Sequence, residues 1–307
     1  MRLTETLGTG RNGVTVIDGG LSTELERRGV DTRGALWTAE PLLRADGSIE
    51  RAHEAFARAG AEIVVTSSYQ LGLDWLEGGG MEPRAARDLM IESTRAARRG
   101  VAGAALIAAS VGPFGAGRAD GGEYTGDYRD RLDDVRRHHE RKIPVLLSTE
   151  PDLVAVETIP LLGELEILLE VLDGLGSPPA WFSLGCRDGE TTHGGDPLDR
   201  VGEMVSGYRG PVAVGVNCTA PEHARAAVGR IAASAPRPIE LVAYPNIGRR
   251  WNATERTWSL GVAPVSEVLL EGFVGVGATI VGGCCGTDSN DVARLRAWRD
   301  RRVVSAP

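Results

Sequence analysis

Residues 212–218 read Val-Ala-Val-Gly-Val-Asn-Cys, a β-branched apolar run that ends in an amide and a thiol. A continuous apolar run of this length is typical of a strand buried on both faces, as in a parallel sheet. Seven other runs of this kind occur along the chain, and most stretches between them carry apolar residues at helical spacing. The eight predicted strands are Val14–Asp18, Ala61–Thr66, Ala104–Val111, Leu153–Glu157, Ala180–Leu184, Val212–Val216, Glu240–Tyr244 and Ala278–Val281.

Eight strand-and-helix units in 307 residues predict an α/β protein with a single (β/α)8 TIM barrel that spans residues 1–307. A doubly wound open sheet is the structural alternative, but it usually has fewer strands and a Gly-x-Gly-x-x-Gly loop after the first one. The first strand here is followed by Gly-Gly-Leu-Ser-Thr-Glu instead. The clearest predicted helices are His53–Ala59, Arg84–Arg98, Gly163–Leu172 and Pro221–Ala233.

The bulk composition is typical of a soluble globular protein. The chain is 42% hydrophobic and 25% charged, and its net charge of −8 argues against a nucleic-acid partner. The longest apolar stretch, Val101–Val111, is too short to cross a membrane, and the polar start at residues 1–13 does not resemble a secretory signal. With four cysteines in a chain of this length, we expect the reducing cytoplasm rather than a disulfide scaffold.

Lys142 is the only lysine, and it lies in the charged stretch Arg131–Lys142, which we interpret as a solvated helix face. Schiff-base chemistry in a barrel needs a lysine at a strand end, so that chemistry is disfavoured. The chain also lacks the Gly-x-x-x-x-Gly-Lys-Ser/Thr loop of nucleotide hydrolases.

Three cysteines follow predicted strands: Cys218, and the pair Cys284 and Cys285 in Val-Gly-Gly-Cys-Cys-Gly. Where these strand ends meet, three thiolates can bind Zn²⁺ and leave one position open, as in catalytic zinc sites. The alternatives are inert core cysteines, which is our interpretation of the isolated Cys186, or a phosphate cradle at the glycines before Cys284.

Other polar residues follow the remaining strands and would meet at the same mouth of a barrel. Asp18 and Glu157 are carboxylates that suit an ammonium group, and zinc suits a sulfur, so the set fits a zwitterionic amino acid with a thiol. Asp18 before two glycines is alternatively a turn cap, whereas an unpaired buried Glu157 would be costly. None of the five histidines lies at a strand end, and we predict no ligand among them.

These motifs resemble the homocysteine S-methyltransferase family, in its branch that uses S-methylmethionine or S-adenosylmethionine, and they are related to betaine–homocysteine methyltransferase. They run in family order over nearly the whole chain. The segments are Asp18-Gly-Gly-Leu-Ser-Thr-Glu-Leu, Leu36-Trp37, Ala59-Gly-Ala-Glu, Thr66-Ser-Ser-Tyr-Gln, Ser110-Val-Gly-Pro, Asp120-Gly-Gly-Glu-Tyr, Glu157-Thr-Ile-Pro, Gly215-Val-Asn-Cys, Tyr244-Pro-Asn and Gly282-Gly-Cys-Cys-Gly.

The resemblance implies a barrel enzyme of methionine biosynthesis, with catalytic Zn²⁺ held by Cys218, Cys284 and Cys285. It implies that Asp18 and Glu157 bind the ammonium of homocysteine. Aromatic rings at the mouth would face a sulfonium donor by cation–π attraction, or else only pack in loops. The predicted substrate-binding residues are Asp18, Gly19, Thr66, Glu157, Asn217, Trp37, Tyr69 and Tyr124.

The implied reaction transfers a methyl group from the sulfonium to the homocysteine thiolate and gives methionine. The alternatives are a different thiol or a selenol as acceptor, betaine as donor, a phosphate-handling barrel lyase or isomerase, and a noncatalytic zinc or redox-sensing protein. Two segments depart from the family pattern and bear on the donor. Gly286 replaces a frequent arginine, and Ile247–Trp251 replaces Ser-Gly-Glu and an aromatic residue.

Overall fold

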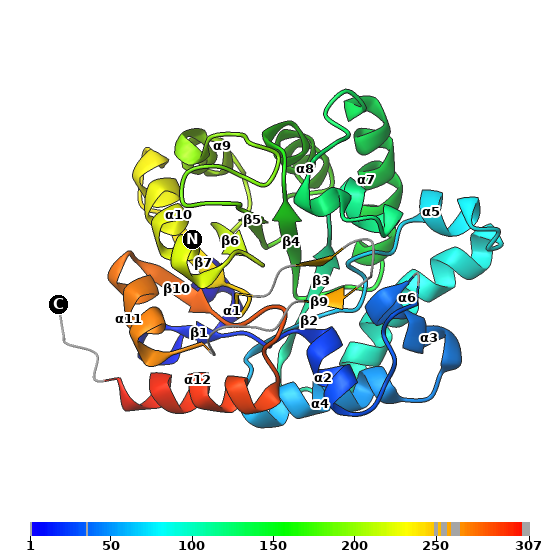
Figure 1. Ribbon diagram of the computed structural model, residues 1–307, viewed down its shortest axis with the longest axis horizontal. Coiled ribbons are helices and arrows are strands. Elements are labelled where there is room, and N and C mark those ends of the chain that lie inside the picture. Colours follow the sequence, from blue (N-terminus) through cyan, green and yellow to red (C-terminus); the bar gives the residue numbers. More distant parts are fainter. Residues whose placement is uncertain (1, 35, 249–250, 253–256, 259–264, 303–307) are drawn as a thin grey trace.

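The computed structural model describes residues 2–34, 36–248, 251–252, 257–258 and 265–302. Eight parallel strands form the centre, in the order β1-β10-β7-β6-β5-β4-β3-β2, and helices surround them (Figure 1). All eight predicted strands are confirmed. Their bounds are β1 Thr15–Val16, β2 Ile63–Val65, β3 Leu106–Val111, β4 Leu153–Ile159, β5 Ala180–Leu184, β6 Val212–Asn217, β7 Glu240–Tyr244 and β10 Ala278–Val281.

The sheet closes on itself between its two outer strands, β1 and β2. Ile17 forms a parallel bridge with Ile63. The Asp18 N–H donates to the Ile63 carbonyl at 3.1 Å, and the Glu62 N–H donates to that of Val16 at 2.7 Å. Closure removes the unpaired sheet edges, so the fold is a (β/α)8 barrel, as predicted, and not an open doubly wound sheet.

The helices lie outside the barrel and follow the strands in turn. An antiparallel pair, β8 Trp251–Asn252 and β9 Thr257–Trp258, lies between β7 and α11 in the sequence. Within the described part of the chain, no helix is long and apolar enough to span a membrane. The α-helices are α1 Leu3–Leu7, α2 Leu21–Arg27, α3 Glu40–Arg44, α4 Ser48–Ala59, α5 Leu73–Gly78, α6 Pro83–Val101, α7 Leu132–Leu147, α8 Leu162–Gly174, α9 Val201–Ser206, α10 Pro221–Ser234, α11 Glu267–Gly275 and α12 Ser289–Arg301.

Side chains fill the inside of the barrel, so a functional site can form only at its ends. The inner cluster sets the large Trp181 of β5 among small neighbours such as Ala108, Ala155 and Ala213. Its chain neighbour Phe182 points the other way, into the larger cluster between the strands and the helices, as the two-residue period of a strand requires.

Helix α1 contributes to the amino-terminal end of the barrel, opposite the mouth. Leu3 belongs to the inner cluster and is fully buried. The Thr4 N–H donates to the carboxylate of Glu240, at the start of β7, at 2.9 Å, and the Thr4 hydroxyl donates to the same group. Apolar contacts of Leu3 and the hydrogen-bonded carboxylate of Glu240 therefore hold this end together. In barrels of this kind, the amino-terminal end serves stability rather than catalysis.

One sequence interpretation is wrong. Residues 131–142 do lie largely in helix α7, but its charged stretch is not solvated throughout, because His138, His139 and Lys142 are buried. These residues share the inward face of the helix with Val135 and Leu146. Because these polar residues occupy core positions, the helical spacing of apolar residues is interrupted in the sequence. The stretch therefore resembled a solvent-exposed helix face.

Candidate active site

A cavity of about 630 Å³ opens at the carboxyl ends of the strands. All eight predicted substrate-binding residues line it, together with Cys218 and Cys284. They come from loops and strand ends that are far apart in the sequence, and the barrel topology brings them together. The lining set includes Asp18, Gly19, Trp37, Thr66, Tyr69, Tyr124, Glu157, Asn217, Cys218 and Cys284.

The three predicted metal ligands form one cluster at this mouth. The Sγ atom of Cys218 lies 3.7 Å from that of Cys285, and the Sγ atoms of Cys284 and Cys285 are 4.0 Å apart. All three lie within 4.8 Å of one another. Tetrahedral zinc with bonds of about 2.3 Å to sulfur places its ligands about 3.8 Å apart, so the thiols fit such an ion without rearrangement.

The charge state of the cluster also suits a cation. Contacts with the side chains of Cys284 and Cys285 lower the pKa of Cys218 well below its ordinary value. The hydroxyl of Tyr124 lies 3.6 Å from the same sulfur. A thiolate is therefore favoured here, and thiolates are the form that binds metal.

The end of β7 bridges the two cysteine-bearing loops. The Cys218 N–H donates to the Tyr244 carbonyl at 3.2 Å, and the Cys284 N–H donates to the Pro245 carbonyl at 2.9 Å. Cys218 adopts a left-handed backbone conformation, with φ of 46°, and the Asn246 amide donates to its carbonyl at 3.1 Å. Non-glycine residues rarely adopt this conformation, and such strain gathers at functional sites.

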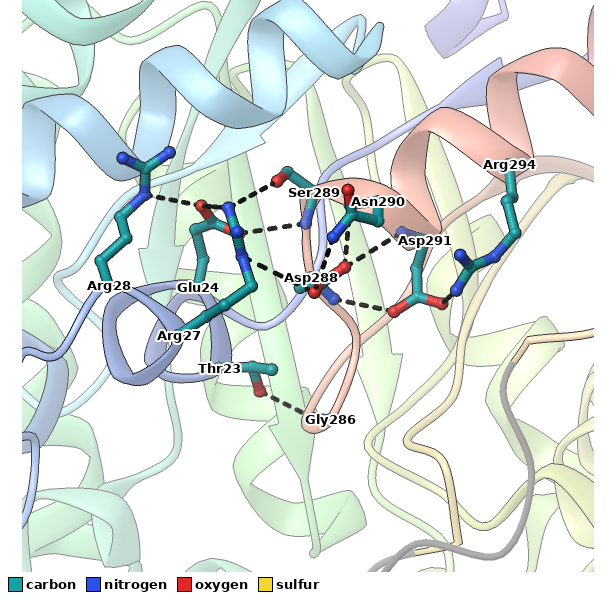
Figure 2. Close-up of polar contacts among 10 residues, drawn as sticks. All are labelled: Thr23, Glu24, Arg27, Arg28, Gly286, Asp288, Ser289, Asn290, Asp291 and Arg294. Carbon is teal, nitrogen blue, oxygen red and sulfur yellow. Dashed lines mark hydrogen bonds and ion pairs between the residues drawn. The ribbon is translucent and has the colours of Figure 1, made fainter.

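Helix α2 holds the loop that follows Cys284 and Cys285 (Figure 2). The Thr23 hydroxyl accepts the Gly286 N–H at 2.9 Å, and the buried carboxylate of Glu24 accepts that of Ser289 at 3.1 Å. Arg27 and Arg28 both bind Glu24 at 2.7 Å. Burial alone would raise the pKa of Glu24, but these hydrogen bonds outweigh it and lower the pKa.

Close backbone contacts join the same two loops directly above the strands. A Cβ atom at Gly20 would lie 2.6 Å from the Cys284 carbonyl oxygen, and one at Gly19 would lie 2.8 Å from that of Thr287. The Gly283 N–H also donates to the Asp18 carbonyl at 3.2 Å. Only glycine permits this approach, so Asp18 and the cysteine pair share one rigid base.

Asp18 and Glu157 are both nearly buried carboxylates in the cavity. Asp18 accepts the Val65 N–H at 2.8 Å. Its pKa lies well above the ordinary value, mainly because of burial, and the charge of Glu157 raises it further. Burial likewise raises the pKa of Glu157 to about 7. A cation bound near both groups would offset the desolvation and their mutual repulsion.

A hydrogen-bonded network inside the barrel orients Glu157. One carboxylate oxygen accepts the Ser110 hydroxyl at 2.5 Å, and the other accepts the Tyr244 hydroxyl at 3.0 Å. The Tyr244 hydroxyl is in turn held by the Trp181 indole N–H at 2.9 Å and contacts the Ser183 hydroxyl at 2.6 Å. The carboxylate therefore has a fixed orientation toward the mouth.

Asn217 lines the cavity, but both ends of its amide contact Thr158. Its oxygen accepts the Thr158 N–H at 2.6 Å, and its nitrogen donates to the Thr158 hydroxyl at 2.8 Å. Thr158 has φ of 58°, which is uncommon for a β-branched residue. These contacts favour a role for Asn217 in fixing the backbone next to Glu157.

The three predicted aromatic residues lie around the same opening. Trp37 and Tyr69 pack edge to face, with ring centroids 6.1 Å apart. Tyr124, in the short helix Gly122–Tyr124, packs against His193 at 5.3 Å. Burial lowers the pKa of His193 to about 4, so its ring is neutral and offers aromatic surface rather than charge.

Sequence reasoning assigned no role to Ser110, Tyr244 or His193, although the first two stand in quoted motifs. Ser110 and Tyr244 lie at the carboxyl ends of β3 and β7, and that position was the available signal. His193 lies in the loop that follows β5, where no sequence pattern marks its contact with Tyr124.

The remaining predictions about this region can also be placed. Cys186 is buried away from the thiol cluster, and burial raises its pKa to about 12, as expected of an inert thiol. The N–H groups of Gly282 and Gly283 donate to carbonyl oxygens, which disfavours a phosphate cradle. Gly286 has φ of 90°. Arg249 and Arg250, and the side chain of Trp251, lie outside the described part of the chain.

Comparison with known proteins agrees with this geometry. The family model for homocysteine S-methyltransferase matches residues 15–298. The homocysteine S-methyltransferase of Escherichia coli (strain K12) is 35% identical over 296 residues, which cover 92% of this chain and 94% of that protein. The selenocysteine Se-methyltransferase of Brassica oleracea var. italica is 33% identical, with 95% of this chain and 90% of that protein covered.

Solved structures give the same answer. The metallated form of the homocysteine methyltransferase MmuM from Escherichia coli superposes with a TM-score of 0.81 at 33% identity, over 93% of this chain and 96% of that one. The apo form of MmuM superposes with a TM-score of 0.72. With the family model matching nearly the full length and relatives above 30% identity, the chain belongs to the homocysteine S-methyltransferase family.

Proposed function

We propose that this protein transfers a methyl group from a sulfonium donor, S-methylmethionine or S-adenosylmethionine, to the thiolate of L-homocysteine and so forms methionine. The observation that carries the proposal is one cavity that joins a three-thiol cluster to two buried carboxylates. Neither a phosphate-handling lyase or isomerase nor a noncatalytic zinc or redox-sensing protein needs both features. We further propose that residues 1–307 act as one domain and that the enzyme works in the reducing cytoplasm, which keeps its four free thiols reduced.

Cys218, Cys284 and Cys285 would hold Zn²⁺, because their sulfur spacing matches a tetrahedral ion and MmuM is described in a metallated form. When bound, zinc supplies a Lewis acid that keeps a coordinating thiol deprotonated at neutral pH. The chain's own contribution is a rigid ligand set, since β7 and helix α2 fix both cysteine loops through backbone hydrogen bonds.

Asp18 and Glu157 would bind the ammonium group of homocysteine. Each carboxylate is destabilised by burial in the empty cavity, so a cation restores favourable charge to both. The backbone near Gly19 and Thr66 borders the same space and would contact the amino acid. Holding the acceptor at its amino end orients its thiolate for attack, which is the entropic part of catalysis.

The donor would enter where Trp37, Tyr69 and Tyr124 surround the opening. Aromatic faces attract sulfonium as they attract other cations, and the apolar rings exclude water from the methyl carbon. The acceptor thiolate forms a bond to that carbon while the sulfonium C–S bond breaks. The electron pair of the broken bond stays on the donor sulfur, which leaves as a neutral thioether.

Metal analysis and a methyl-transfer assay test this proposal together. We expect one equivalent of zinc, and methionine from homocysteine with S-methylmethionine or S-adenosylmethionine but not with betaine. Cys285→Ser should lose the metal and at least about a thousand-fold in activity, whereas the matched control Cys186→Ser should keep both. A folded, reduced protein that binds no zinc, or a zinc-bound protein that makes no methionine from any donor, would contradict it.

A selenol acceptor is the second candidate, favoured by the similarity to a selenocysteine Se-methyltransferase. The same carboxylates and metal would serve it, since both acceptors carry the same ammonium group and would present a selenolate or a thiolate to the metal. Competition between homocysteine and selenocysteine in one assay decides between them, because the ratio of their kcat/KM values reports the preferred acceptor directly.

A further inference from the structure

Helix α7 turns a set of ionisable side chains toward the barrel, where a core would ordinarily be apolar. The adjacent His138 and His139, and Lys142 one turn later, lie on its inward face and are at most 2% exposed. Burying such groups is unfavourable unless each has a partner. Apolar residues of similar volume usually stabilise a fold at least as well, so this face points to a role other than stability.

Each of these side chains does have a partner outside the helix. His139 contacts the buried carboxylate of Glu164, at the start of α8, at 2.8 Å. Glu164 also accepts the Tyr128 hydroxyl at 2.6 Å and the Phe114 N–H at 2.6 Å. Burial would raise the pKa of Glu164, but these bonds and the charge of His139 lower it, so the carboxylate is ionised.

Lys142 reaches from the same face to the active-site side of the barrel. Its ammonium donates to the backbone carbonyl of Tyr69 at 2.8 Å. Burial lowers the pKa of Lys142 to about 7, while the charges of Glu164 and Glu157 act in the opposite direction. The only lysine of the chain thus lies near enough to Glu164 and to Glu157 for the charges of both carboxylates to act on it.

The segment that carries Tyr69 is held at three points. Lys142 binds the carbonyl of Tyr69, and Gly112, just after β3, lies so close to Tyr69 that a Cβ there would sit 2.6 Å from this carbonyl and 2.7 Å from the ring. One helical turn before Lys142, the His138 ring packs on Gly72, where a Cβ would sit 2.3 Å from it. The ring of Tyr69 therefore has one position at the mouth, against Trp37.

We propose that Lys142 is a positioning residue for methyl transfer, which fixes the ring of Tyr69 at the mouth by holding its backbone carbonyl against Gly112. The inference rests on the proposed function, in which that ring faces the sulfonium donor. Helix α7 thereby sets the donor side of the cavity, while β7 and α2 set the metal side. The two sides are built from different elements and can be perturbed separately.

Kinetics of three variants test the inference. Lys142→Met removes the ammonium and keeps the stem, so we expect a KM for the sulfonium donor about ten-fold higher, with zinc content and the KM for homocysteine unchanged. Gly112→Ala displaces Tyr69 by a different contact and should give the same pattern. Lys142→Arg keeps a cationic donor and should restore the donor KM to within about three-fold of wild type.

Arg299→Met is the matched control, because Arg299 is a fully buried cation far from the mouth that pairs with Glu62 and Asp300. It should lower stability without raising the donor KM. The inference is overturned where Lys142→Met and Gly112→Ala both fold, bind zinc and keep the wild-type donor KM. It is overturned equally where Arg299→Met raises the donor KM as much as Lys142→Met does.

A spectroscopic readout separates this inference from the proposed function. Since Lys142 is the only lysine, protein labelled with ¹⁵N-lysine gives a single side-chain ammonium signal. At pH 6 we expect that signal to exchange slowly with water and to shift in Gly112→Ala, whatever reaction the enzyme performs. An unshifted, rapidly exchanging signal contradicts the positioning contact, whereas a wild-type enzyme without sulfonium-dependent activity contradicts only the proposed function.

Discussion

The two ends of the barrel handle buried carboxylates in opposite ways. At the amino-terminal end, Glu62 accepts the Val16 N–H and pairs with Arg299, and Glu240 accepts two groups of Thr4. At the mouth, Asp18 and Glu157 have hydrogen bonds but no ion pair among the described residues. Burial raises the pKa of each, and the charge of Lys142 offsets only part of this rise at Glu157. The first end is complete by itself, whereas the second would be completed by the ammonium group of the proposed substrate.

The largest expected effect is a loss of stability at the amino-terminal end. Arg299→Met leaves the partly buried Glu62 without its charge partner; because removal of one partner of a fully buried pair costs about 3–5 kcal/mol, we expect a loss near the lower end of that range. Urea unfolding measures this loss, and methyl transfer assayed at low temperature should keep its wild-type kcat. A large drop in kcat of the folded variant would mean that the two ends are not independent.

The reverse pattern is expected at the mouth. Glu157→Gln should reduce kcat/KM for homocysteine about a hundred-fold, because the ammonium loses an ionic hydrogen bond. The same change should stabilise the fold by about 1–2 kcal/mol at pH 8. The folded pKa is about 7 against an ordinary 4.5, so the folded protein holds more protons than the unfolded chain in between, and stability falls as pH rises through that window.

Unfolding of wild type and Glu157→Gln from pH 4.5 to 8 checks the sign of that effect. The difference between the two should be smallest near pH 4.5 and should grow toward pH 8. Equal pH dependence of both proteins would show that Glu157 is not the source of the strain at the mouth.

A smaller effect is expected where helix α2 holds the metal loop. Thr23→Val keeps the side-chain shape but removes the acceptor of the Gly286 N–H. Loss of an outer-shell contact of this kind typically weakens metal binding by about ten-fold or more, so zinc release to a chelator should be about ten times faster. Thr23→Ser retains the hydroxyl and should release zinc at the wild-type rate.

The smallest effect is expected away from both ends, at His53 in helix α4. Its ring is fully buried, neither nitrogen has a partner in the described structure, and burial lowers its pKa to about 4. The unfolded chain therefore holds more protons between about pH 4 and the ordinary 6.5, and stability falls as pH drops through that window. His53→Leu should remove this fall and add about 1 kcal/mol at pH 5.

The fold was predictable from the sequence because the pattern that marks a strand is local and occurs eight times along the chain. Each apolar run marks a strand, and the eight runs fix the class even where the boundaries move, as at β1, which spans only Thr15–Val16 of the predicted Val14–Asp18. Cys218 and the cysteine pair were predictable for the same reason, since parallel strands converge at one end. Their spacing and partners follow from loop contacts that no run of residues encodes.

What escaped prediction lies on helix and strand faces. Lys142 looked exposed because its neighbours in the sequence are charged, yet its direction is set by the helix axis and by partners in the loop after β2 and on α8. Ser110 has the same difficulty, because a hydroxyl within an apolar strand is equally compatible with a backbone contact. The direction in which each side chain points, and not its residue type, determined the contacts of Lys142 and Ser110.

The glycine contacts between the first and last loops of the barrel hold Asp18 and the cysteine pair at a set separation. Because Gly20 touches the Cys284 carbonyl and the Gly283 N–H donates to that of Asp18, the backbone joins the proposed ammonium site directly to the proposed sulfur site. An acceptor one methylene shorter, such as cysteine or selenocysteine, would span the two sites less well than homocysteine does. The enzyme would thus select its substrate by length, with no side chain assigned to reject the wrong one.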